Sequence, residues 1–185
     1  MSAEETLRAL RSAREGDIAA REALLARIRP RVVLWCAARM SVSLRARVEP
    51  EDLAQDILLG VHGRLDAFDG DTPAAFYGWV FRIAENRIRD AVDHFGAARR
   101  RPVELPSPAH ATTPSEAAGR SEIVTRVRNA VMLLPDDHRD VVRMRLLEAR
   151  EVADVAREMG RSANAVRVLY CRALRELRGH VPEFA

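Results

Sequence analysis

The stretch EVADVAREMGRSANAVRVLYCRALRELR, residues 151–178, predicts two short helices joined by a tight turn. Gly160 stands where the first helix should end, because glycine adopts the left-handed conformation of a helix cap at little cost. Ser162 follows two residues later and offers a hydroxyl oxygen that can cap the next helix. The stretch therefore has the pattern of a helix-turn-helix.

The second helix of this stretch has two chemically different faces. Apolar side chains recur every three or four positions and predict one buried stripe, formed by Val166, Leu169, Tyr170, Ala173, Leu174 and Leu177. The opposite face is basic, since residues 161–178 hold five arginines and one glutamate, a local charge of +4. Such a helix suits the major groove of DNA, where arginines contact phosphates and a few polar side chains read base edges. A solvated basic face on an ordinary helical hairpin is the alternative.

The composition sets broad limits. A chain of 185 residues with 48% hydrophobic content can form a packed core in one or two domains. A net charge of +3 is compatible with a nucleic-acid partner but does not establish one. All 30 basic residues are arginines, whose planar side chains suit guanine edges and phosphates.

Nothing in the sequence has the pattern of an enzyme or of a metalloprotein. It has no glycine-rich phosphate loop, no nucleophile elbow and no paired-histidine site, so neither catalysis nor a metal or other cofactor is expected. Cys36 and Cys171 form no metal-binding spacing, and Cys36 is expected to be a small buried apolar residue. Without a signal peptide or a membrane-spanning run, we expect a cytoplasmic protein.

Helical periodicity extends over most of the chain. Gly16 and Asp17 indicate a break and a new helix start, and a separate helix is expected after Pro30. Residues 97–120 contain four prolines and no apolar period, which is typical of a flexible linker. We expect an all-α protein of two small helical domains joined by this linker, residues 1–96 and residues 121–185.

A helix is expected to begin at Pro50, with acidic residues in its first turn. Its polar residues Asp52, Gln55 and Asp56 lie away from the apolar side. They form either a solvated face or a surface for a partner protein, and the spacing alone does not separate these two interpretations.

The segment FDGDTPAAF, residues 68–76, is predicted to be a loop. Its terminal phenylalanines either anchor the loop to the core or form a stacking site for an unpaired base. The amphipathic helix that follows, residues 78–95, has a mixed outer face of Arg82, Glu85, Asn86, Arg89 and Asp93. This face is suited to a few directed contacts rather than to non-specific DNA binding.

Taken together, these segments resemble the small extracytoplasmic-function sigma factors of bacterial RNA polymerase, which keep only the second and fourth sigma regions. The N-terminal resemblance rests on AREGDIAAREALL, EDLAQDILLGVHGRL and FYGWVFRIAENRIRDA, in that order. The C-terminal resemblance rests on LP-x3-R at residues 134–139 and on the xVA-x3-G-x5-V-x5-RA pattern of the helix-turn-helix. The two parts of the resemblance together cover nearly the whole chain.

The resemblance implies roles for residues of the N-terminal domain. The helix that docks on the clamp of the largest polymerase subunit would use Asp52, Gln55 and Asp56. The loop that captures a flipped base of the minus-ten promoter element would include Phe68, Asp69 and Phe76. The helix that faces the melted strand would use Arg82, Asn86, Arg89 and Asp90.

The resemblance also implies which residues read the minus-thirty-five element: Arg161, Ser162, Asn164, Arg167, Val168 and Arg172. The sequence departs from the family at two places. Asn164, Ala165 and Leu169 stand where the family often has a glycine-threonine pair and a following arginine. The arginine pair that usually follows the minus-ten helix is displaced to residues 99–101. These departures affect the promoter sequence that is expected, not the family.

The sequence thus predicts a monomeric sigma factor that binds core RNA polymerase and promoter DNA, with an anti-sigma protein as a further expected partner. One alternative is a stand-alone helix-turn-helix regulator, which would bind a two-fold operator as a dimer. Another is a protein-interaction module whose basic helix docks on an acidic partner.

Overall fold

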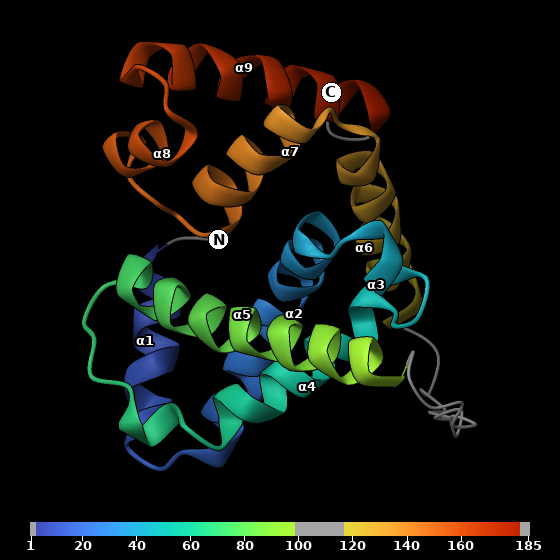
Figure 1. Cartoon of the computed structure of the whole chain (residues 1–185). Helices are drawn as coiled ribbons and strands as arrows, with labels where there is room; N and C mark the ends of the chain where they lie inside the picture. The colour runs from blue at the N-terminus through green and yellow to red at the C-terminus, as the bar shows by residue number, and fades with distance from the viewer. Residues whose placement is uncertain (1–2, 99–116, 182–185) are drawn as a thin grey trace.

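The computed structural model describes residues 3–98 and 117–181, and within these residues it contains helices and no strand. This confirms the all-α prediction. Most of the predicted linker, including Arg99, Arg100 and Arg101, lies outside the described residues. In chain order (Figure 1), the elements are α1 (Ala3–Arg14), α2 (Ile18–Arg39), α3 (Val42–Arg45), α4 (Pro50–His62), the 3₁₀ turn η1 (Leu65–Ala67), α5 (Pro73–Ala98), α6 (Ala117–Leu133), α7 (Asp136–Val142), the π-helical turn η2 (Arg143–Leu147), α8 (Val152–Met159) and α9 (Ala163–His180).

Local chemistry sets several helix ends where the sequence predicts them. Gly160 ends α8 with φ of 61° and ψ of 33°, the left-handed conformation. Ser162 caps α9, and its hydroxyl accepts a hydrogen bond from the backbone N–H of Ala165 at 3.2 Å. Asp17 caps α2 in the same way through the N–H of Ala20, after a turn at Gly16 with φ of 91°.

The separate helix expected after Pro30 is a wrong prediction, because α2 continues through Pro30 without a break. Proline removes one backbone hydrogen bond from a helix interior and usually bends or ends the helix. Here buried side chains on both sides of it, such as Ile28 and Val32, pack into the same core. This shared burial holds the two halves of α2 in one helix.

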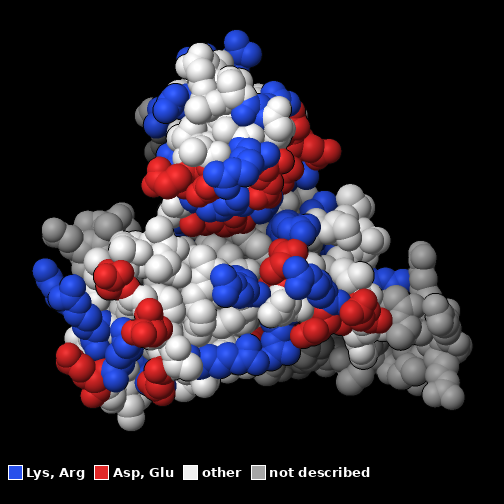
Figure 2. All heavy atoms as spheres, turned by 60° about the vertical axis from the view of Figure 1, so that its left-hand side comes forward, with Lys and Arg blue, Asp and Glu red and all other residues white. Residues whose placement is uncertain are grey.

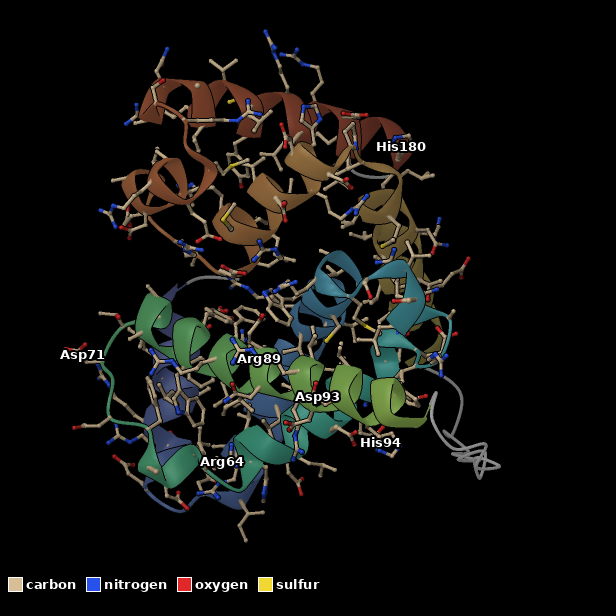
Figure 3. All side chains as sticks on the ribbon, in the orientation of Figure 1. Arg64, Asp71, Arg89, Asp93, His94 and His180 are labelled. Carbon is tan, nitrogen blue, oxygen red and sulfur yellow. The ribbon has the colours of Figure 1, made fainter. Side chains whose placement is uncertain are left out.

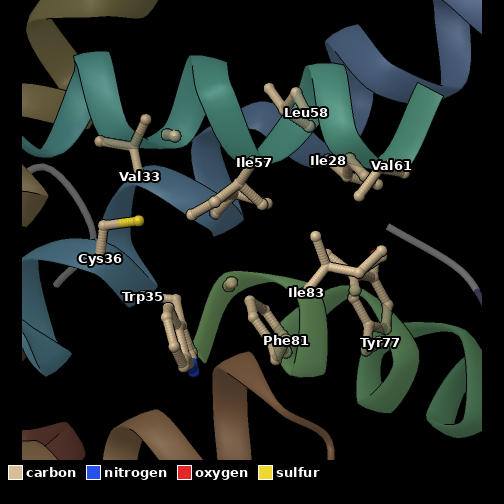
Figure 4. Packing of buried hydrophobic residues seen from close by; sticks show 14 of the residues in the cluster. Ile28, Val33, Trp35, Cys36, Ile57, Leu58, Val61, Tyr77, Phe81 and Ile83 are labelled. Carbon is tan, nitrogen blue, oxygen red and sulfur yellow. The ribbon is translucent and has the colours of Figure 1, made fainter. Parts of the chain in front are cut away.

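The main core lies between α1, α2, α4 and α5 (Figure 4). Trp35 of α2 stacks on Phe81 of α5, with ring centroids 5.1 Å apart. A smaller core holds the C-terminal helices together, and it consists of Leu134, Val141, Val142, Met144, Val155, Ala156, Val166 and Ala173.

The C-terminal helices are not separate from the first core in this structure. Both α6 and η2 pack against α2, and Leu147 of η2 is buried in the main core (Figure 1). We refer to α1–α5 as the N-terminal body and to α6–α9 as the C-terminal body. The two bodies therefore share a packed junction along α2.

The two cysteines should differ sharply in reactivity. Cys36 is fully buried, and this burial strongly raises the pKa of its thiol, whereas Cys171 is exposed on α9. Because the thiolate is the reactive form, we expect a thiol reagent at pH 8 to modify one cysteine per native chain within minutes and the second only on unfolding. The Cys171→Ala variant should show no fast thiol, and two fast thiols in the native chain would contradict this packing.

Candidate nucleic-acid interface

The predicted DNA-reading residues of α9 and of the turn before it lie on one exposed surface. All six are solvent-exposed or lie at the exposed start of the helix, while Val166 and Ala173 on the opposite side are fully buried. The structure thus brings together the set predicted from the sequence: Arg161, Ser162, Asn164, Arg167, Val168 and Arg172.

These residues differ in how free they are to bind a ligand. Among the described residues, the side chains of Arg167 and Arg172 form no hydrogen bond or ion pair, so their guanidinium groups are available for phosphates or base edges. Arg161 is paired with Asp137 of α7, and Ser162 is engaged as the helix cap. Val168 is 43% exposed and could contact only an apolar group, such as a thymine methyl.

The outer face of α5 carries the second predicted set. Arg82, Asn86, Arg89 and Asp90 are all exposed, and Figure 3 shows Arg89 and Asp93 on the same side of this helix. Arg89 donates a hydrogen bond to the Asn86 side-chain oxygen at 3.1 Å. This pair is directed along the helix surface, which leaves other donors of the guanidinium group free.

The loop before α5 is anchored by its two phenylalanines. Phe68 and Phe76 are buried, and their rings pack edge to face with centroids 5.6 Å apart. A Cβ atom on Gly70 would come within 2.3 Å of the Phe68 ring, so only glycine fits at this position. In this structure the two phenylalanines therefore anchor the loop to the core.

The exposed atoms of that loop are polar. Asp69 is fully exposed, with one carboxylate oxygen 3.7 Å from an Arg14 nitrogen, and Asp71 lies at the outer edge of the loop in Figure 3. Thr72 caps α5 by accepting a hydrogen bond from the N–H of Ala75. A base that entered this loop would meet carboxylates and backbone groups before it met an aromatic ring.

The predicted docking residues on α4 also share one exposed face. Asp52, Gln55 and Asp56 all point to solvent, and the neighbouring Leu59 is 65% exposed. Leu59 thus adds one exposed apolar side chain to an otherwise polar face.

A cleft between the two bodies was not predictable from the sequence. It has a volume of about 690 Å³ and lies between α2 and α5 on one side and η2 and α8 on the other. Figure 2 shows acidic and basic side chains gathered where the upper, C-terminal body meets the lower one. Arg82 of the predicted minus-ten set lines this cleft.

The described residues contain no group of three or more His, Cys, Asp or Glu side chains that could hold a metal ion. Within the same residues, no helix is both long and apolar enough to cross a membrane.

Comparison with known proteins identifies both bodies. The family model for sigma-70 region 2 matches residues 24–100, and the model for sigma-70 region 4 matches residues 125–177. The ECF RNA polymerase sigma factor SigD of Mycobacterium tuberculosis is 30% identical over 168 residues, which are 90% of this chain and 79% of SigD. The ECF sigma factor ShbA of Streptomyces griseus is 31% identical over 89% of this chain and 88% of its own length.

A solved structure, that of CnrH in complex with the cytosolic domain of CnrY, covers 97% of this chain and 98% of that chain. The two are 22% identical and superpose with a TM-score of 0.45.

The chain belongs to the sigma-70 family of RNA polymerase sigma factors, in its extracytoplasmic-function group. It directs promoter recognition and transcription initiation, and the stand-alone regulator is not favoured.

Proposed function

We propose that the work of promoter recognition is divided between α9 and the surface formed by α5 and its preceding loop. In this proposal α9 enters the major groove of the minus-thirty-five element, with Arg167 and Arg172 as its free cations. One observation carries this assignment. Both arginine side chains are exposed and have no partner among the described residues, and the opposite side of the helix is buried.

The α5 surface would hold the melted strand of the minus-ten element. Its mixed charge favours a few directed contacts over strong non-specific attraction, since Asp90 shares this exposed face with Arg82, Asn86 and Arg89. The flipped base would enter the loop next to Asp69, above the buried phenylalanine rings.

The exposed face of α4 would dock on core RNA polymerase. Asp52 and Asp56 offer carboxylates to a basic surface, and Leu59 adds apolar area at the same place. Because the proposed surfaces for polymerase and for DNA are separate, a substitution can disrupt one kind of binding and leave the other intact.

We further propose that this protein acts as a monomer in the cytoplasm, where core polymerase and the chromosome are found. It would carry out no bond chemistry itself, because nucleotide addition takes place in the polymerase active site. An anti-sigma protein is the expected regulatory partner, and it would hold the factor inactive by covering surfaces of both bodies.

The proposal is tested by measuring promoter binding with and without core enzyme. A labelled duplex carrying both elements should be bound weakly by the protein alone and tightly, with a footprint over both elements, when core polymerase is added. Light scattering should give the mass of one chain, 20.7 kDa. Tight binding of a two-fold site by a dimer without polymerase would overturn the proposal and favour the stand-alone regulator.

A further inference from the structure

Helix α7 contacts α9, the helix proposed to enter the major groove, through both apolar and polar side chains. The two helices pack against each other (Figure 1), and Val141 of α7 lies in the same small core as Val166 and Ala173 of α9. Two polar side chains at the start of α7, Asp137 and His138, make further contacts outside this core.

These two polar contacts reach places that lie far apart along α9. Asp137 is paired with Arg161, which is in the turn directly before α9. His138 Nδ1 lies 2.6 Å from Oε2 of Glu176, close to the other end of α9. Arg161 and Glu176 are about four helical turns apart, roughly 22 Å along a helix axis. Two adjacent residues of α7 therefore hold α9 near both of its ends.

The turn before α9 leaves Arg161 little freedom. Gly160 ends α8 in the left-handed conformation, and the backbone N–H of Arg161 donates a hydrogen bond to the Ala156 carbonyl oxygen at 2.9 Å. Ser162, the next residue, caps α9. Arg161 is thus tied to α8 through its backbone and to α7 through its side chain, so a shift of Arg161 moves the start of α9 as well.

The partner of Arg161 distinguishes it from the other arginines of this surface. The Arg167 and Arg172 side chains form no hydrogen bond or ion pair among the described residues. Arg161, by contrast, would have to leave Asp137 before it could bind a base edge or a phosphate. The carboxylate left behind would then be unpaired and would repel nearby phosphates. The pairing favours a role for Arg161 within the protein rather than on the DNA.

Base recognition depends strongly on how α9 is oriented. A helix of 18 residues is about 27 Å long, so a tilt of about 5° about its midpoint moves each end by roughly 1 Å. Hydrogen bonds to base edges tolerate a donor–acceptor range of only about 0.5 Å. Phosphate attraction changes much less with such a shift, because it acts over a longer range. Contacts at both ends of α9 therefore matter more for base discrimination than for overall affinity.

We infer that Asp137 and His138 are positioning residues for promoter recognition. Together they fix the orientation in which α9 presents Arg167 and Arg172 to the minus-thirty-five element. Arg161 is the anchor of one of these contacts and does not read a base. The inference rests on the proposed function, because it assumes that α9 enters the major groove.

Asp137→Asn breaks the contact with Arg161 and also removes a negative charge. The charge change strengthens binding to every duplex alike, so it cancels in the ratio of the affinities for a natural and a scrambled upstream element. This ratio, measured with the complete polymerase complex, is expected to fall about two- to fivefold in Asp137→Asn and in Arg161→Ala, the largest effect usual for an exposed ion pair. With side chains 58% and 40% exposed, both variants are expected to fold.

The base profile of the upstream element distinguishes an anchor from a reader. It is obtained from a set of promoter duplexes, each with one base pair of that element changed. As an anchor, Arg161 gives the same flattened profile when either it or Asp137 is replaced, and the double variant Asp137→Asn/Arg161→Ala adds nothing further. A loss of preference at one base pair in Arg161→Ala, with the natural profile in Asp137→Asn, would identify a base reader and overturn the inference.

The second contact has a test of its own. His138→Ala removes the partner of Glu176 and should flatten the profile in the same way. His138→Asn places an amide nitrogen where Nδ1 lies, so it can still donate a hydrogen bond to Glu176 and should keep most of the discrimination. Equal losses in the two variants would remove His138 from the positioning role.

Asp136→Asn is the matched control. Asp136 carries the same charge in the same first turn of α7, but it pairs with Arg139 of its own helix and not with α9. Asp136→Asn and Asp137→Asn both remove a carboxylate from this helix start, so their melting temperatures should agree. Asp136→Asn should keep the natural ratio and profile. A fall equal to that in Asp137→Asn would trace the effect to charge or helix stability and overturn the inference.

The same data separate a failure of this inference from a failure of the proposed function. If the natural protein did not discriminate between natural and scrambled upstream elements, the proposed role of α9 would fail, and the positioning role with it. If the natural protein discriminated and Asp137→Asn kept the full ratio and profile, the positioning role alone would be overturned.

Discussion

Replacing Arg167 with alanine is expected to weaken recognition of the minus-thirty-five element by roughly 5- to 150-fold, the range for loss of one arginine–base contact. The side chain is exposed and has no partner among the described residues, so its loss should not disturb folding. The measurement is the affinity of the complete polymerase complex for promoter duplexes with the natural and with a scrambled upstream element.

A charge-matched control separates base reading from simple loss of charge. Arg8→Ala removes the same charge from an exposed position on α1, and it should change promoter affinity less than twofold. Affinity for core polymerase should be unchanged in both variants. If Arg167→Ala instead reduced core binding, the assignment of the α9 surface to DNA would be wrong.

Replacing Asp52 with arginine is expected to lower the affinity for core RNA polymerase by at least about tenfold, because it reverses a charge on the proposed docking face. Asp52 also lies in the first turn of α4. There a carboxylate interacts favourably with the helix dipole and stabilises the helix by about 0.3–1 kcal/mol. A small fall in melting temperature should therefore accompany the loss of binding. Co-purification and fluorescence titration with core enzyme measure the affinity.

Glu22→Arg is the matched control for this reversal. Glu22 is exposed on α2, outside the proposed docking face, and its reversal should leave core affinity within twofold. Gln55→Ala should reduce affinity in the same direction as Asp52→Arg, but less. Unchanged core affinity in Asp52→Arg would remove α4 as the docking helix.

The parts of the fold that depend on neighbouring residues were predictable from the sequence. Gly160 and Ser162 set the turn of the helix-turn-helix through backbone conformation and capping, which act within three residues. The buried stripe of α9 follows from apolar spacing alone, and with it the exposed position of Arg167.

The features that the sequence did not decide depend on contacts that local patterns do not carry. The continuity of α2 through Pro30 depends on burial of both its halves in a core built from other helices. The burial of Phe68 and Phe76 depends on Trp79 and on the space left by Gly70. At Pro30 tertiary packing overrides the local signal, and at the two phenylalanines it decides between the two interpretations that the sequence left open.

The junction between the bodies left no local signal at all. Arg31 lies 116 residues from Leu147, and Arg128 lies 77 residues from Glu51. An arginine on a helix surface has the same sequence pattern whether it binds water, DNA or a distant carbonyl group. The sequence therefore predicts two helical domains and a linker, but not how the domains pack.

The most direct test of the central claim is run-off transcription from a genomic promoter library, with core RNA polymerase alone and with this protein added. We predict new start sites that require both components and that share one minus-ten and one minus-thirty-five element. No new start sites, together with sequence-specific DNA binding by the protein alone, would contradict the account.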